Sequence, residues 1–254
     1  MEMLKMELLK KELIEYIKTP KGFILTAVFL FFAISSPATA KFMNEILAAV
    51  AGDINISFPD PTLYDSWGQV FKNMNSICLI VYLIVMASTV SQEKSKGSIL
   101  LVLTKKVSRF QFLVSKFIIG ILVFTILLVV STVLSGWYTN LLFGAYMYDG
   151  FWMSLLLYWL MGVFFTAVAV FVSVIGKTTT TSALLAFAIY AILQILNISI
   201  EIAMFNPSGA SSIVNGILTG TIKQSELWKP ILSTTIMSMI LFTSTYFIFK
   251  KQEI

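Results

Sequence analysis

Residues Phe117–Trp137 read FIIGILVFTILLVVSTVLSGW and contain no charged side chain. A run of about 20 apolar residues is what an α-helix needs to cross the hydrocarbon core of a bilayer. Because a helix satisfies its own backbone hydrogen bonds in lipid, such runs predict transmembrane helices. Six stretches qualify: Gly22–Ala40, Met74–Val90, Phe117–Trp137, Phe151–Val174, Thr181–Ile202 and Ile231–Phe249.

The composition supports the same fold class. Hydrophobic residues make up 57% of the chain and charged residues only 12%, whereas soluble domains carry about 25% charged residues. We therefore expect an all-α integral membrane protein that forms a single transmembrane domain over residues 1–254. The sequence has one cysteine, Cys78, and no histidine, which removes the commonest metal ligand and general base. We expect no catalytic residue, cofactor site or metal site in this chain.

The distribution of Lys and Arg predicts the orientation. One side of the six spans carries most of the 18 basic residues, and the positive-inside rule makes this side cytoplasmic. Both termini are then cytoplasmic, in a multi-pass protein of a bacterial plasma membrane. Residues Ala38-Thr39-Ala40 resemble a signal-peptide cleavage site, but the acidic region before them is untypical of a signal peptide. The basic residues assigned outside are Lys41, Lys72, Lys223 and Lys229.

Residues 1–19 have the spacing of an amphipathic helix. Its charged residues, among them Glu12 and Glu15, are assigned to the other faces. We expect an interfacial elbow helix whose lysines lie on anionic lipid and which leads into the first span. The alternative is a basic flank that only sets the topology. The predicted apolar face consists of Met6, Leu9, Leu13, Tyr16 and Ile17.

Segment 92–110, between the second and third spans, holds an apolar run between two basic clusters. Ser98 can cap a short helix over Ile99–Leu103. An apolar helix displayed to the cytoplasm is suited to binding a partner protein. The alternative is a helix that lies in the headgroup region and binds no partner.

The same segment resembles the ABC-2 family of transporter permeases. The family pattern is an acidic residue, a Gly-Ser pair, leucines, and a Val-Ser-Arg that leads to a lysine in the next span. Here the family's usual proline before Val-Ser-Arg is replaced by Lys106, and Asn206-Pro207 in the outer segment 203–230 also matches the family. The residues that carry the resemblance are Glu93, Gly97, Ser98, Leu100, Leu101, Thr104, Val107, Ser108, Arg109 and Lys116.

This resemblance implies one half of a transporter. Two copies, or one copy with a related permease, would form the pathway. Each would bind a cytoplasmic ABC ATPase through segment 92–110, and ATP and Mg would be bound by that ATPase. Nucleic acid is not an expected partner, whereas membrane lipid is.

Other functional classes fit the sequence less well. Gly176-Lys177-Thr178 resembles the end of a phosphate-binding loop, but position 171 is Phe171, where that loop requires glycine. Ion-coupled carriers and channels usually place ionisable residues near mid-membrane, and here the acidic candidate, Glu201, lies near a predicted span end. The small-residue spacings Ser131/Ser135 and Ser182/Ala186 predict close helix contacts.

The low charge of the spans favours an amphipathic or hydrophobic cargo, because a charged cargo would lose hydration without gaining a partner. We expect export of a peptide toxin or antimicrobial peptide. Lipid, drug or polysaccharide export by the same machinery is the alternative, followed by a secondary carrier or channel.

Overall fold

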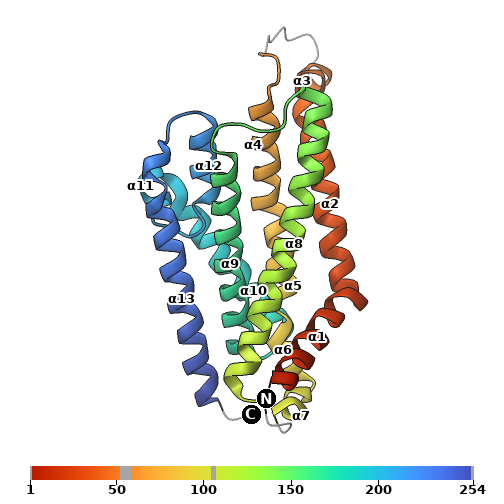
Figure 1. Cartoon of the computed structure of the whole chain (residues 1–254), viewed down its shortest axis with the longest axis vertical. Coiled ribbons are helices and arrows are strands. Elements are labelled where there is room, and N and C mark those ends of the chain that lie inside the picture. Colours follow the sequence, from red (N-terminus) through yellow and green to blue (C-terminus); the bar gives the residue numbers. More distant parts are fainter. Residues whose placement is uncertain (1, 52–58, 104–106, 253–254) are drawn as a thin grey trace.

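The computed structural model describes residues 2–51, 59–103 and 107–252, and within these residues it contains helices and no strand (Figure 1). Thr104 lies outside the described residues, and so do the side chains of Met6 and Leu101. Six helical stretches are long and apolar enough to cross a membrane. The predicted all-α membrane protein with six spans is therefore confirmed.

The six spans follow one another along the chain. The first is α2, and the second combines α4, a π-helical turn, α5 and α6. The third, fourth and sixth are α8, α9 and α13, and the fifth is α10 followed by a 3-10 turn. Their bounds are α2 Pro20–Lys41, α4 Leu63–Asn73, the π-helical turn Met74–Cys78, α5 Leu79–Met86, α6 Thr89–Ser95, α8 Arg109–Phe143, α9 Phe151–Ile175, α10 Thr179–Ile195, the 3-10 turn Leu196–Ile198, and α13 Trp228–Lys251.

The second span begins earlier than we predicted, at Leu63 instead of Met74. A capping box starts it: the backbone N–H of Thr62 donates to Oδ2 of Asp65 at 2.8 Å. The added turns are amphipathic, with Trp67 and Phe71 buried against the bundle, so an apolar run does not reveal them.

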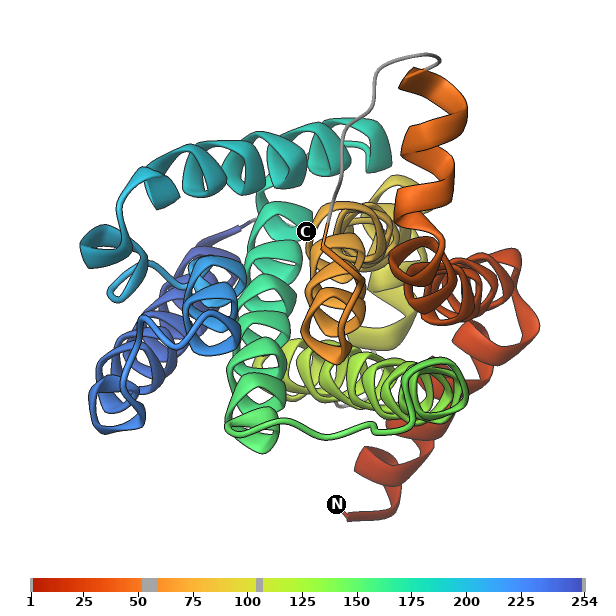
Figure 2. The ribbon, with the colours of Figure 1, turned by 90° about the horizontal axis from the view of Figure 1, so that it is seen from above.

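The fifth span ends earlier than we predicted, and the outer segment that follows it is folded. Asn197 has φ −80° and ψ 21°, which breaks the helix before Ile202. The chain continues through α11 (Ile200–Ala203), α12 (Ala210–Leu218) and a 3-10 turn (Gln224–Glu226). α12 packs against α4 and α9 and buries Ile213 and Val214. Seen from above, α12 lies beside α9 (Figure 2).

Helix α9 is central, because it packs against α8, α10, α12 and α13. Gly162 of α9 leaves no room for a β-carbon next to the ring of Phe124 in α8. The hydroxyl of Ser135 in α8 donates to the carbonyl oxygen of Ala33 in α2 at 2.9 Å. Ser182 and Ala186 are both buried. The predicted contacts of small residues are thus present.

The remaining α-helices of the described residues are α1 (Glu2–Lys18), α3 (Met43–Ala51) and α7 (Ser98–Leu103). α1 packs against α8 and α2. α1, α7 and the end of α13 lie at the same end of the bundle (Figure 1). This arrangement brings Glu93 next to α1 and Arg109 next to the end of α13.

Candidate functional site

The candidate site is the end of the bundle where α6 and α7 meet α1 and α8. Gly97 ends α6 with φ 69°, a conformation that glycine adopts without strain, and α7 starts at the next residue. Ile99 of α7 is buried in a small apolar cluster with Phe112, Val174 and Phe249. Leu100 is 49% exposed. α7 is therefore anchored on one side and displays a leucine on the other.

A buried ion-pair cluster fixes the start of this segment. Nζ of Lys116 in α8 lies 2.6 Å from Oε2 of Glu12 in α1 and 2.7 Å from Oε1 of Glu93 in α6. The exposed fractions of Lys116, Glu12 and Glu93 are 3%, 1% and 7%. Lys11 adds a contact of 3.1 Å to Oε1 of Glu93. The cluster joins α1, the second span and the third span.

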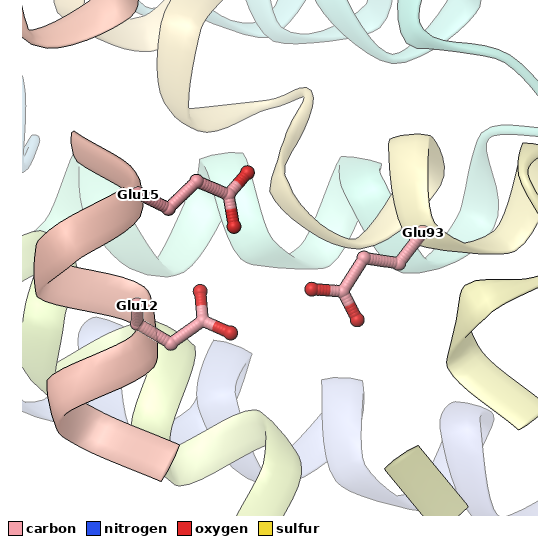
Figure 3. A group of neighbouring side chains, drawn as sticks. All are labelled: Glu12, Glu15 and Glu93. Carbon is pink, nitrogen blue, oxygen red and sulfur yellow. The ribbon is translucent and has the colours of Figure 1, made fainter. Parts of the chain in front are cut away.

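The carboxylates of Glu12, Glu15 and Glu93 converge at this point (Figure 3), within 4.8 Å of one another. By spacing alone the three could hold a metal ion. The ammonium group of Lys116, however, already lies between Glu12 and Glu93 and supplies the positive charge that such a site needs. We therefore interpret the cluster as an internal salt-bridge network.

Lys11 is the partly exposed member of the salt-bridge network. Burial alone would lower the pKa of Lys11, but the carboxylates of Glu93 and Glu12 outweigh burial, so the pKa of Lys11 is raised above its ordinary value. Lys11 therefore stays charged at neutral pH. Nζ of Lys21 in α2 donates to Oε1 of Gln92, the residue before Glu93 in α6. The first span therefore also contacts this segment.

A second set of contacts fixes the segment to the opposite side of the bundle. Nζ of Lys94 donates to the carbonyl oxygen of Val174 in α9 at 2.8 Å and to Oε1 of Gln252 at 2.9 Å. Nη1 of Arg109 donates to the carbonyl oxygens of Phe249, Lys250 and Gln252 at 2.7 to 2.9 Å. Phe249 and Lys250 belong to the last turn of α13 and Gln252 is its C-cap residue, so Arg109 supplies a donor where no further helical turn provides one. The segment thus caps the fourth and sixth spans.

The end of the segment is locally ordered. The backbone N–H of Gln111 donates to Oγ of Ser108 at 3.2 Å, and the N–H of Ser108 donates to Oε1 of Gln111 at 3.1 Å. This capping box starts α8. Val107 packs against the apolar cluster around Ile99. Ser98 donates to the carbonyl oxygen of Glu93 at 3.3 Å.

Several sequence interpretations need correction here. We predicted that Glu12 lies on a face of α1 other than the apolar one, but it is buried between Leu8 and Tyr16. Ile17, which we assigned to the apolar face, is 71% exposed. Leu8, Glu12 and Tyr16 recur at steps of four and so lie on one helix face. A carboxylate between two apolar residues on such a face indicates a buried ion pair. Arg109, one of the residues that carry the family resemblance, donates from its Nη1 to the end of α13.

Comparisons with known proteins identify the family of the chain. The family model of the ABC-2 family transporter proteins matches residues 6–254. The chain is also similar to YxlG of Bacillus subtilis (strain 168), described as an uncharacterized transmembrane protein. The two sequences are 24% identical over 208 residues, which cover 81% of this chain and 78% of YxlG.

Proposed function

Because the chain belongs to the ABC-2 family of transporter proteins and is a membrane subunit of an ABC transporter, we propose that it exports an amphipathic or hydrophobic substrate with energy from a separate ATPase. The subunit transports and is not itself a catalytic enzyme. ATP and Mg bind to the partner ATPase in this proposal. The alternatives are lipid, drug or polysaccharide export by the same machinery.

One observation carries the proposed contact with the ATPase. α7 displays Leu100 while Ile99, Glu93 and Arg109 hold its flanks to the spans. Burying one exposed leucine in a partner groove contributes about 1.5–3 kcal/mol. Because Ile99 and Glu93 are held against the spans, a force applied to α7 would reach the bundle through these contacts.

The proposed orientation places α7 and both termini in the cytoplasm of a bacterial plasma membrane. It follows from the unequal distribution of basic residues and is supported by the position of α1 and the end of α13 at one end of the bundle (Figure 1). A second copy or a related permease would complete the pathway.

The cargo proposal rests on the character of the spans. Buried polar groups along the spans are mostly neutral, such as Ser131, Thr166 and Asn75. The ionic cluster of Glu12, Glu93 and Lys116 lies at one end of the bundle. A strongly charged cargo would lose its hydration at mid-depth without gaining a charged partner. We favour a peptide toxin or antimicrobial peptide, for which the re-entrant α12 would form an outer gate.

Co-purification tests the proposed ATPase contact. Tagged chain extracted from its native membranes should carry an ATP-hydrolysing subunit. Replacing Leu100 and Leu101 with Asp should release that subunit, whereas Leu100→Met, which keeps the apolar contact, should retain it. Equal recovery of the ATPase with the Asp variant would place the contact elsewhere on the chain.

Substrate stimulation tests the cargo. ATP hydrolysis by the reconstituted complex should rise with amphipathic helical peptides. Stimulation by simple sugars or nucleotide-linked glycans, with no response to peptides, would remove the peptide proposal and support polymer export.

A further inference from the structure

Helices α8 and α9 touch at one level and separate at another. They are in close contact where Gly162 faces Phe124. From there they diverge toward the end of the bundle that is opposite both termini (Figure 1). The crevice between them has a volume of about 700 Å³, which is within the range of about 300–1,000 Å³ typical of ligand sites.

The linker between the two helices closes the wide end of the crevice. Gly144 (φ 74°) ends α8 and Gly150 (φ 89°) precedes α9. The carbonyl oxygen of Tyr146 accepts a hydrogen bond from Nε1 of Trp67 at 2.9 Å, and the Tyr148 ring packs on the Trp67 and Phe151 rings. The linker is therefore held in place, and the crevice below it is preformed.

The walls of the crevice are apolar, and none of the lining residues is charged. Val129, Val133 and Leu156 line it and remain exposed. Since α8 and α9 are membrane spans, exposed side chains at this level face lipid. The crevice is thus open sideways to the bilayer.

The rim carries hydrogen-bond donors. Trp137 and Trp152 are 61% and 69% exposed, and with Asn140 and Tyr146 they surround the wide end of the crevice. Tryptophan and tyrosine favour the level of the lipid headgroups. Within the described residues, no side-chain hydrogen bond to protein engages the indole N–H of Trp137 or Trp152. These donors are available to the ester and phosphate oxygens of a lipid.

The depth of the crevice matches one leaflet. Leu128 lies at its narrow end and Trp137 at its rim. A rise of about 1.5 Å per residue separates these two positions by about 13–14 Å along α8. Half of the hydrocarbon core of a bilayer is about 15 Å thick. A membrane-spanning helix of a partner is longer than the crevice and would meet the linker at its wide end. A lipid tail ends within one leaflet and therefore fits the depth of the crevice.

We propose that the crevice between α8 and α9 is a binding site for one acyl tail of a phospholipid from the leaflet opposite the termini, with its headgroup oxygens at the rim formed by Trp137, Asn140 and Trp152. Neutral donors and the lack of charge on the lining favour a phospholipid without a requirement for a particular net charge. The site does not depend on the nature of the transported cargo.

The test compares two substitutions one turn apart on α8. Val133 lines the crevice, whereas Val130 is 45% exposed and does not line it. Native mass spectrometry of the purified chain should show one retained phospholipid. Val133→Trp should lower its occupancy at least several-fold, and Val130→Trp should leave it unchanged. Melting temperatures of both variants check that they are folded.

Photo-crosslinking locates the tail. A phospholipid with a diazirine on its acyl chain should label peptides from α8 and α9 around the crevice, and Val133→Trp should abolish this label while Val130→Trp keeps it. Even labelling over all exposed apolar helices would mean annular lipid only and would overturn the proposal. Disulfide-linked dimers formed by Val133→Cys in membranes would show that a second copy covers the crevice, and would also overturn it.

Discussion

Nζ of Lys116 lies 2.6 Å from Oε2 of Glu12, although the two residues are 104 positions apart in the sequence. Both side chains are almost fully removed from solvent. Removing two charges from water costs several kcal/mol per ion, and a buried pair recovers this cost only with good geometry and further hydrogen bonds. Glu93 and Lys11 supply the further contacts here. The pair therefore depends on the whole cluster.

Replacing Lys116 with Met should destabilise the protein strongly. The substitution leaves Glu12 and Glu93 buried without their shared counter-ion, and breaking such a pair costs about 3–5 kcal/mol. Thermal unfolding in detergent measures the loss. Lys229→Met is the control, because its 3.6 Å pair with Glu226 is partly exposed and such pairs contribute about 0–1 kcal/mol. Equal melting temperatures for the two variants would show that the cluster contributes no more than a surface pair.

Arg109→Ala should loosen the end of α13. Its Nη1 holds three carbonyl oxygens, and hydrogen bonds to charged groups contribute about 1.5–3 kcal/mol. Hydrogen exchange of residues 249–252 should accelerate in this variant. Lys251→Met, at an exposed position in the same turn, should leave exchange unchanged. Unaltered exchange in the Ala variant would show that the cap is not needed to hold α13.

Cysteine labelling checks the proposed orientation. In a Cys78→Ala background, Ser95→Cys should react only after permeabilisation, and Asn215→Cys should react in intact cells, because both positions are exposed at opposite ends of the bundle. Ser66 at the outer end of the second span is unsuitable for labelling, because it is buried and its hydroxyl is hydrogen-bonded to the hydroxyl of Thr139 at 2.8 Å. Labelling of Ser95→Cys from outside would reverse the orientation.

The purified chain should not hydrolyse ATP, and Lys177→Ala should not change this result. The hydroxyl of Thr178 caps α10 by accepting from the N–H of Thr181 at 3.2 Å. Gly176 follows a helix, α9, whereas a phosphate loop follows a strand. A radiolabelled ATP assay with the detergent-purified chain measures this. Hydrolysis that disappears with Lys177→Ala would contradict the assignment of ATP binding to a partner.

The sequence predicted the six spans because hydropathy is a local property. It missed the first turns of the second span, since Trp67 and Phe71 lie on one face of an amphipathic helix. It also missed the early end of the fifth span, where Asn206 donates to the carbonyl oxygen of Leu193 at 2.7 Å and to Oδ1 of Asn197 at 2.9 Å. These contacts arise only after the outer segment folds back.

In the candidate site, too, the sequence predicted the local features but not the tertiary contacts. Segment 92–110 was identified from its own residues and from family resemblance, whereas the partners of Glu93 and Arg109 lie on α1, α8 and α13. No local pattern specifies such partners. A lysine at the start of an apolar span and a glutamate on an apolar helix face were each visible, but only the tertiary structure pairs them. The role of segment 92–110 as the ATPase contact stays a prediction.

Glu93 and Lys94 are consecutive residues of α6, so their side chains leave the helix about 100° apart. Glu93 contacts the elbow helix and the third span, and Lys94 contacts the fourth span and the residue after the sixth. A rotation of α6 about its own axis would therefore turn both groups of helices at once. α7 follows after Gly97, so a partner bound at α7, as proposed, would act on α6. Movement of α7 would then reach the bundle as a torque on α6, transmitted to the other helices by the side chains of Glu93 and Lys94.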